Sequence, residues 1–122
     1  MENEFDAIVI GSGMSGGWAA KELTEKGIKT LVLERGRMVE HIKDYPTTNM
    51  APWEFEFRKN PTKETREEYP IQKEVYAFNE ATKHFFASDK KHPYSTPKDK
   101  PFRWIKGFQT GGKSLLWWRQ SY

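Results

Sequence analysis

The sequence predicts an α/β fold that begins with a strand–helix–strand unit, and three observations support this prediction. Residues 7–10 and 30–33 are short aliphatic runs without polar alternation, which is typical of parallel strands covered on both faces. Residues 14–26 between them have small and apolar residues at helical spacing. A glycine-rich turn joins the first run to this helix. The crossover between the two strands is expected to be right-handed.

The expected helix runs from Met14 to Lys26. One side of it carries Gly16, Ala20, Leu23 and Gly27, and the last of these is placed to end the helix. Glu22 and Lys26 are four residues apart on the solvent side and form a favourable charge pair.

The turn into the helix has the pattern G-x-G-x-x-G. The first glycine permits a tight turn, the second lets a pyrophosphate approach the backbone, and the third lets the helix pack closely on the strands. The free N–H groups of the helix N-terminus favour phosphate binding. The turn therefore supplies six candidate dinucleotide-binding residues: Gly11, Ser12, Gly13, Met14, Ser15 and Gly16.

An acidic residue follows the second strand at the distance that dinucleotide binding requires. Glu34 lies 18 residues after Gly16 and is expected to accept hydrogen bonds from an adenosine ribose. A ribose 2′-phosphate would be repelled there, although Arg35 and Arg37 are near enough to keep NADP open. A glycine-rich turn in an ordinary α/β fold is the alternative without a cofactor.

The middle of the chain, residues 38–106, is an irregular excursion rich in aromatic residues and contains all seven prolines. Alternation in residues 53–57 predicts a short half-buried strand, and a brief helix is expected from Pro61 or Thr62. Residues 88–101 are expected to be loop. Two interpretations remain open for the excursion: an arm that wraps neighbouring structure or helps cover an active site, and a segment whose aromatics fill packing gaps.

Composition and charge exclude several classes of function. The net charge of +3 comes from 20 basic and 17 acidic residues interspersed along the chain, which argues against nucleic-acid binding. The chain has no cysteine, and its three histidines lack metal-ligand spacing. The first apolar run is too short for a signal peptide or a membrane segment. We expect a cytoplasmic protein, or a periplasmic one if a partner subunit exports it.

The segment 107–114 matches G-x-x-x-x-G-K-[ST], the phosphate loop of P-loop NTPases. In that interpretation Lys113 neutralises phosphate charge, Ser114 holds magnesium, and residues 102–106 form the preceding strand. Only eight residues follow Ser114, which is too few for the helix and the later acidic strand that this nucleotide fold needs. A P-loop module is therefore the alternative and not the main prediction.

Two longer patterns carry a family resemblance. The glycine motif followed by Glu34-Arg35-Gly36 resembles the FAD-binding start of flavoprotein oxidoreductases, and Glu34 and Arg35 are both candidate cofactor-binding residues. The segment GGKSLLWWRQ resembles the flavin loop of the glucose–methanol–choline oxidoreductases, in particular the bacterial sugar and sugar-acid dehydrogenase branch. The resemblance makes five residues candidate FAD contacts: Gly111, Gly112, Lys113, Ser114 and Trp117.

The resemblance implies the N-terminal part of a Rossmann-like FAD-binding domain. Residues 1–37 are its βαβ unit, 38–106 the connecting excursion and 107–122 the flavin loop, with the substrate domain absent. Leu116 stands where some relatives attach the flavin to a histidine, so noncovalent FAD is expected. Trp118 replaces the usual glycine after the loop tryptophan, which leaves open whether the loop keeps its path.

The family oxidises CH–OH groups of alcohols, sugars or sugar acids by hydride transfer to flavin N5. Its catalytic histidine belongs to a part of the family's chain that has no counterpart here, so we nominate no catalytic residue and no metal ligand. The expected partners are a small-molecule substrate and the remainder of the flavoprotein, either as more of the chain or as a companion subunit. A noncatalytic interaction fragment is the third alternative.

Overall fold

The computed structural model describes residues 4–116, and it divides the chain into two compact units. One unit, called here the N-terminal unit, combines Met1–Val39 with Gly107–Tyr122. The other, called the middle unit, is Glu40–Lys106. Segments from both ends of the sequence therefore belong to the same unit.

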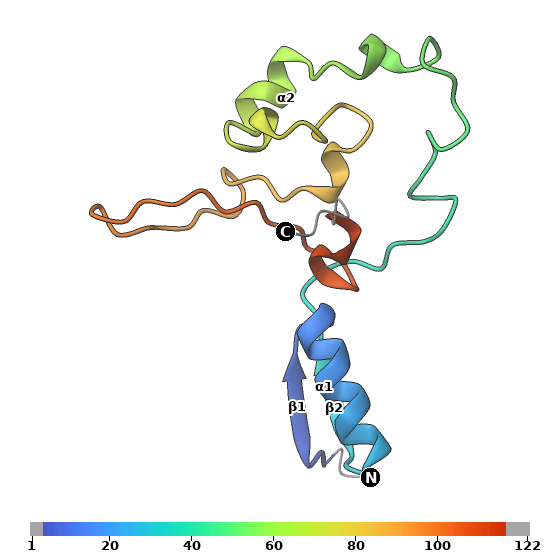
Figure 1. The fold of residues 1–122 in the computed structure, drawn as a ribbon, viewed down its shortest axis with the longest axis vertical. Helices are drawn as coiled ribbons and strands as arrows, with labels where there is room; N and C mark the ends of the chain where they lie inside the picture. Colours follow the sequence, from blue (N-terminus) through green and yellow to red (C-terminus); the bar gives the residue numbers. More distant parts are fainter. Residues whose placement is uncertain (1–3, 117–122) are drawn as a thin grey trace, which may run out of the picture. The chain divides into compact units, whose positions relative to one another are not determined.

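The N-terminal unit contains the predicted strand–helix–strand arrangement. Strand β1 (Ala7–Ile10) is followed by helix α1 (Met14–Glu25) and strand β2 (Thr30–Leu33), and α1 runs alongside the strands (Figure 1). The strands are parallel and pair in register from Ala7 with Thr30 to Ile10 with Leu33. Both predicted strands are confirmed, and the helix ends one residue earlier than expected. The unit is thus a small α/β piece with two parallel strands, which is consistent with part of a Rossmann-like domain.

Helix α1 packs on the strands through the side that the sequence predicted. Ala20 and Leu23 are half-buried there, and Val9 of β1 is 8% exposed. A Cβ at Gly16 would overlap the carbonyl oxygen of Gly11 and lie 3.4 Å from Cγ1 of Val9. Gly16 therefore permits the close approach of the helix to the turn and the strand. The predicted pair of Glu22 and Lys26 is also present, at 3.9 Å.

The opposite face of the two strands is apolar and open, which differs from the expectation that both faces are covered. Ile8 is 60% exposed and Ile10 is 86% exposed. Their register partners Leu31 and Leu33 lie on the same face, because side chains alternate along each strand. Among residues 4–116, α1 is the helix that packs on this sheet, and one helix covers one face.

The middle unit is built from short helices joined by turns. It contains η1 (Glu56–Lys59), α2 (Lys63–Glu68), η2 (Gln72–Glu74) and η3 (Lys83–Phe85). The predicted brief helix is confirmed as α2. It begins after Thr62, whose hydroxyl accepts a hydrogen bond from the Thr65 amide at 3.2 Å, as an N-cap residue does.

The predicted strand over residues 53–57 is wrong. Trp53 is 82% exposed and Phe57 is 57% exposed, so the alternation does not bury one face. The amides of Glu54 and Arg58 donate to carbonyls three residues earlier, which makes turns. A strand needs a neighbouring segment to pair with, and no segment of the described chain pairs with this one.

A small aromatic core holds the middle unit together. Phe78 and Phe86 are buried, with ring centroids 5.2 Å apart, and the ring of Tyr69 lies 5.1 Å from that of Phe78. Gln72 is fully buried and donates from Nε2 to the Ala87 carbonyl at 3.0 Å. Some aromatics of the excursion thus pack within the middle unit, whereas Trp53, Tyr76 and Phe102 are exposed, and both interpretations of the excursion stay open.

A long loop at the end of the middle unit doubles back on itself (Figure 1). Lys106 closes it, since its Nζ lies 3.0 Å from Oδ1 of Asp89 and also donates to the His92 carbonyl. The Tyr94 ring centroid lies 4.5 Å from the same Nζ, and the Tyr94 hydroxyl accepts from the Trp104 amide at 2.8 Å. Residues 88–101 have no helix or strand, as predicted.

In the part of the chain that the structure describes, no helix has the length and apolar character needed to cross a membrane. This finding concerns membrane-spanning helices alone, and the compartment of the protein stays a prediction.

Candidate functional site

The candidate site lies within the N-terminal unit, where the turn between β1 and α1 meets the end of β2 and the second glycine segment. We define the second glycine segment as residues 107–116. It ends in the short helix η4 (Gly112–Leu116), which contacts α1. The turn leaves β1 at Gly11, which has φ +90°, and α1 begins after Gly13. Most of the predicted binding residues are therefore in one unit.

Glu34 is held by the turn and by its own strand end. Its Oε2 accepts from the Ser12 amide at 2.7 Å and from the Ser12 hydroxyl at 2.5 Å. Its Oε1 accepts from the Gly36 amide at 2.6 Å. The Ser12 hydroxyl, and then the Gly36 and Ser12 amides, lower the pKa of Glu34 from 4.5 to about 2. The carboxylate is thus ionised and oriented at neutral pH.

The second glycine segment joins this arrangement through its backbone. The Gly111 amide donates to the Ser12 hydroxyl at 3.0 Å, and the Thr110 amide donates to the Arg37 carbonyl at 2.8 Å. Arg37 and Gln109 form an isolated parallel bridge. Two glycine motifs that are about a hundred residues apart in sequence therefore lie next to each other.

Two glycines allow the backbones to come this close. A Cβ at Gly36 would overlap the backbone of Gln109 and Phe108, closer than the 3.0 Å that Cβ atoms keep. A Cβ at Gly112 would lie 2.8 Å from Cα of Gly13, and Gly112 has φ +62°, where side chains are strained. Sequence reasoning missed the role of Gly36. Its position directly after Glu34-Arg35 was a signal in the sequence, but that position did not indicate that Gln109 would lie beside it.

The two arginines after Glu34 have contacts inside the N-terminal unit. The guanidinium of Arg35 lies over the Phe108 ring, 3.9 Å from its centroid. Arg37 donates from Nη1 to the Met38 carbonyl at 3.2 Å. Both are positive groups close in sequence to the candidate ribose-binding carboxylate of Glu34.

Gln109 is a buried polar residue that sequence reasoning did not single out. It is 3% exposed, and its Nε2 has no hydrogen-bond partner among residues 4–116. Buried amide groups are usually hydrogen-bonded, so this donor is an exception within the second glycine segment.

The remaining predicted residues lie at the surface or outside the described chain. Met14 and Ser15 are exposed at the start of α1, and Lys113 and Ser114 are exposed in η4. Trp117, a predicted FAD contact, lies outside the described residues, as does Trp118.

The polar groups of the N-terminal unit suit binding, and no metal centre accompanies them among the described residues. No group of three or more metal-binding side chains occurs among residues 4–116. The histidines belong to the middle unit, where His84 Nε2 lies 3.0 Å from the Asp44 carbonyl oxygen. The N-terminal unit therefore presents a carboxylate, backbone amides and a helix N-terminus, which suit binding of a ligand with phosphate and hydroxyl groups.

The P-loop alternative lacks its first structural requirement. Residues 102–106 form no strand, and η4 is a short 3-10 helix. A phosphate loop connects a strand to an α-helix, so the described residues do not have that geometry.

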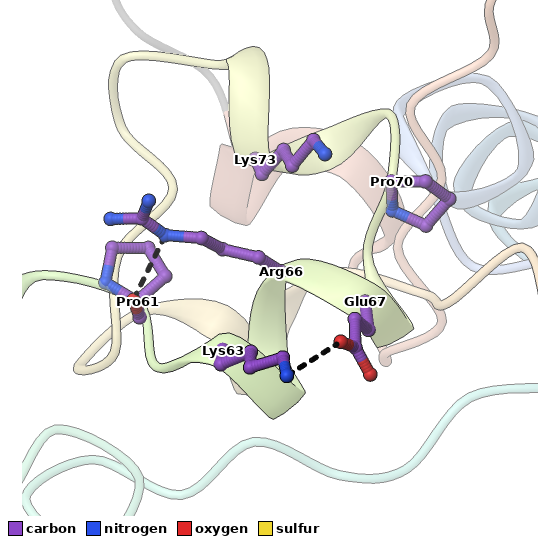
Figure 2. A pocket seen from close by; sticks show the side chains of 6 residues that line it. All are labelled: Pro61, Lys63, Arg66, Glu67, Pro70 and Lys73. Atoms are coloured by element: carbon purple, nitrogen blue, oxygen red, sulfur yellow. Dashed lines mark hydrogen bonds and ion pairs between the residues drawn. The ribbon is translucent and has the colours of Figure 1, made fainter.

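A hollow on the middle unit has a different character. It is lined by Pro61, Lys63, Arg66, Glu67, Pro70 and Lys73 (Figure 2). Lys63 lies 4.0 Å from Glu67, and Arg66 donates from Nε to the Pro61 carbonyl at 3.1 Å. Figure 2 shows the Arg66 and Lys63 head groups pointing in different directions, so the basic groups do not converge on a common ligand position.

Comparisons with known proteins give short matches. The chain is 62% identical over 32 residues to the thiamine thiazole synthase of Methanococcus vannielii, which is 26% of this chain and 12% of that protein. It is 35% identical over 78 residues to the protein FixC of Bradyrhizobium diazoefficiens, which is 62% of this chain and 16% of that protein. The thiamine thiazole synthase of Archaeoglobus fulgidus is 66% identical over 32 residues, 26% of this chain and 12% of that protein.

The matched segments thus cover 8–16% of the length of the curated relatives. No family model matches the chain, and no solved structure gives a significant match. These findings do not show the glucose–methanol–choline family, which stays a prediction.

Proposed function

We propose that this chain is the FAD-binding N-terminal portion of an oxidoreductase that acts on CH–OH groups of an alcohol, a sugar or a sugar acid. One observation carries the proposal: an ionised carboxylate at the end of β2 is fixed by the glycine turn that precedes α1. The partial similarities to thiamine thiazole synthase and FixC support its coarser part, a flavoprotein oxidoreductase. The family resemblance of the sequence supports the choice of substrate class.

The residues of the N-terminal unit fit the adenosine half of FAD. The turn from Gly11 to Gly16 and the amides at the start of α1 would hold the pyrophosphate. Glu34 would hold the ribose: its carboxylate has about four acceptor positions, and three hydrogen bonds to it come from Ser12 and Gly36. The Arg35 backbone amide also acts on this carboxylate and lowers its pKa, so a ribose hydroxyl would share the carboxylate with these donors.

The second glycine segment would hold the part of FAD beyond the pyrophosphate. By the family resemblance, Gly111, Gly112, Lys113, Ser114 and Trp117 are the residues proposed for this contact. Leu116 cannot form a bond to the flavin, so the cofactor would be bound noncovalently.

FAD fits the charge distribution better than NADP does. A 2′-phosphate would meet the ionised Glu34, whose pKa is lowered to about 2. Arg35 lies over the Phe108 ring and Arg37 donates to the Met38 carbonyl.

The chemistry that bound FAD would provide is to accept a hydride from the substrate carbinol. The groups that bind the substrate and move its proton would come from the remainder of the flavoprotein, as more of the chain or as a companion subunit. The open apolar face of β1 and β2 supports this part of the proposal, since parallel sheets are normally covered on both faces. Ile8, Ile10 and Leu33 would be buried there.

The test is titration of the purified chain with FAD, followed by quenching of flavin fluorescence and by a thermal melt. Saturable binding, a higher melting temperature with FAD, competition by ADP, and release of all flavin on denaturation would support the proposal. A parallel titration with ATP and magnesium tests the P-loop alternative. Magnesium-dependent ATP binding without FAD binding would overturn the proposal.

The variant Glu34→Gln sharpens the test, because it keeps the shape of the side chain and removes its charge. We expect weaker FAD binding by about tenfold, since hydrogen bonds to charged groups contribute about 1.5–3 kcal/mol. Equal affinity of the variant and the wild type would contradict the assignment of Glu34 to the ribose.

A further inference from the structure

We propose that Ser12 is a positioning residue: its hydroxyl orients the Glu34 carboxylate and at the same time fixes the second glycine segment. The effect on the cofactor rests on the proposed binding of FAD. The positioning itself can be measured without any cofactor.

The two hydrogen bonds of the hydroxyl determine this role. Ser12 Oγ donates to Oε2 of Glu34 at 2.5 Å and accepts from the Gly111 amide at 3.0 Å. A serine hydroxyl has a single proton, and that proton is used on the carboxylate. The oxygen is then left to accept, and the Gly111 amide is the donor that reaches it.

The two bonds support each other. Donation to an ionised carboxylate makes a hydroxyl oxygen a better acceptor, so the bond from Gly111 is strengthened by the charge of Glu34. Ser12 is half-buried, which limits competition from water for both bonds. The hydroxyl thereby connects positions that are 22 and 99 residues away in the sequence.

The role is specific to the hydroxyl and not to the turn as a whole. The Ser12 amide also donates to Glu34, and this bond survives loss of the side chain. The second glycine segment keeps the bond from the Thr110 amide to the Arg37 carbonyl. Removing the hydroxyl therefore loosens the Gly111 end of the segment and one side of the carboxylate without removing the other contacts.

The consequence for binding is a coupling between two cofactor contacts. The carboxylate would meet the ribose and the second glycine segment would meet a later part of the cofactor. One hydroxyl holds both, so a ligand that orders Glu34 also favours the bound position of Gly111. This coupling requires no movement of the strands or of α1.

The experiment compares the wild-type chain with Ser12→Ala, Ser12→Cys and Ser12→Thr. Without FAD, NMR gives the hydrogen exchange rate of the Gly111 amide and the titration midpoint of the Glu34 carboxyl. For Ser12→Ala and Ser12→Cys we expect Gly111 exchange to be faster by about tenfold and the Glu34 midpoint to move toward 4.5. Ser12→Thr retains the hydroxyl and should restore both values.

Thr24→Ala is the matched control. It removes a hydroxyl from α1 that donates to the Ala20 carbonyl at 2.8 Å and has no contact with Glu34 or Gly111. Both readouts should keep their wild-type values in this variant. Ser12→Cys has nearly the shape of serine and carries the test should Ser12→Ala fail to fold.

The FAD titration separates this inference from the proposed function. With FAD we expect Ser12→Ala to bind about tenfold more weakly and Ser12→Thr to bind like the wild type. Wild-type values of Gly111 exchange and of the Glu34 midpoint in folded Ser12→Ala or Ser12→Cys would overturn the positioning role. A wild-type chain that does not bind FAD, but shows the expected changes in exchange and titration, would overturn the proposed function alone.

Discussion

Replacing Gly36 with alanine would separate the second glycine segment from the end of β2. The added Cβ would overlap the backbone of Gln109 and Phe108, and backbone atoms cannot rotate away as a side chain can. The segment therefore has to move. The three atoms nearest to the added Cβ belong to Phe108 and Gln109 and not to the strands or α1, so we expect those elements to persist.

The cost follows from the contacts that the displaced segment loses. It donates two hydrogen bonds, through the amides of Thr110 and Gly111, at 2.8 and 3.0 Å. Each contributes about 1 kcal/mol. Arg35 over the Phe108 ring adds about 0.5–1 kcal/mol. The expected loss is about 2–3 kcal/mol, which would weaken FAD binding by about 30-fold to 150-fold if FAD requires the segment in place.

Gly17→Ala is the control for this change. Its Cβ would have ordinary contact with the Ser12 carbonyl oxygen, at 3.8 Å, and the position is inside α1. Alanine there should raise stability by about 0.5–1 kcal/mol, because glycine is a poor helix former. The assays are urea unfolding, hydrogen exchange of the Gly111 amide, and FAD titration. Unchanged Gly111 exchange together with unchanged FAD affinity in Gly36→Ala would refute the reasoning.

Three further predictions concern single groups. The pKa of Glu34 in the folded chain is about 2 against an ordinary 4.5, so the ionised carboxylate stabilises the fold above pH 4.5 and this stabilisation is lost as the pH falls toward 2. Urea unfolding at a series of pH values should show this loss in the wild type and not in Glu34→Gln. Replacing Gln109 with methionine removes a buried donor that has no partner among residues 4–116, so the free energy of unfolding should rise by up to about 1 kcal/mol. A fall of that size in the free energy of unfolding would contradict the prediction. Lys106→Met leaves the Asp89 carboxylate without its cation and should lower the stability of the middle unit by about 3 kcal/mol in a thermal or urea melt. Adding Asp89→Asn should restore much of this stability. Equal stability of the single and the double variant would argue against the pairing.

Local signals were sufficient where an element depends on neighbouring residues in the sequence. The aliphatic runs, the spacing of small residues and Gly27 predicted β1, α1 and β2, and Thr62 indicated where α2 begins. The same reasoning failed at residues 53–57. Alternation there had the period of a strand, but a strand is completed by a partner, and the sequence contained no information on whether one lies beside it.

The sequence by itself determined the strand–helix–strand unit, the glycine turn and the acidic residue after β2, because each depends on periodicity, capping or a fixed spacing along the chain. The tertiary structure decided that Gly36 admits the backbone of Gln109 and that the Ser12 hydroxyl connects Glu34 with Gly111. These contacts join residues up to 99 positions apart. No local pattern specifies such a contact, since it depends on how the intervening chain folds and on which backbone atoms are free to meet.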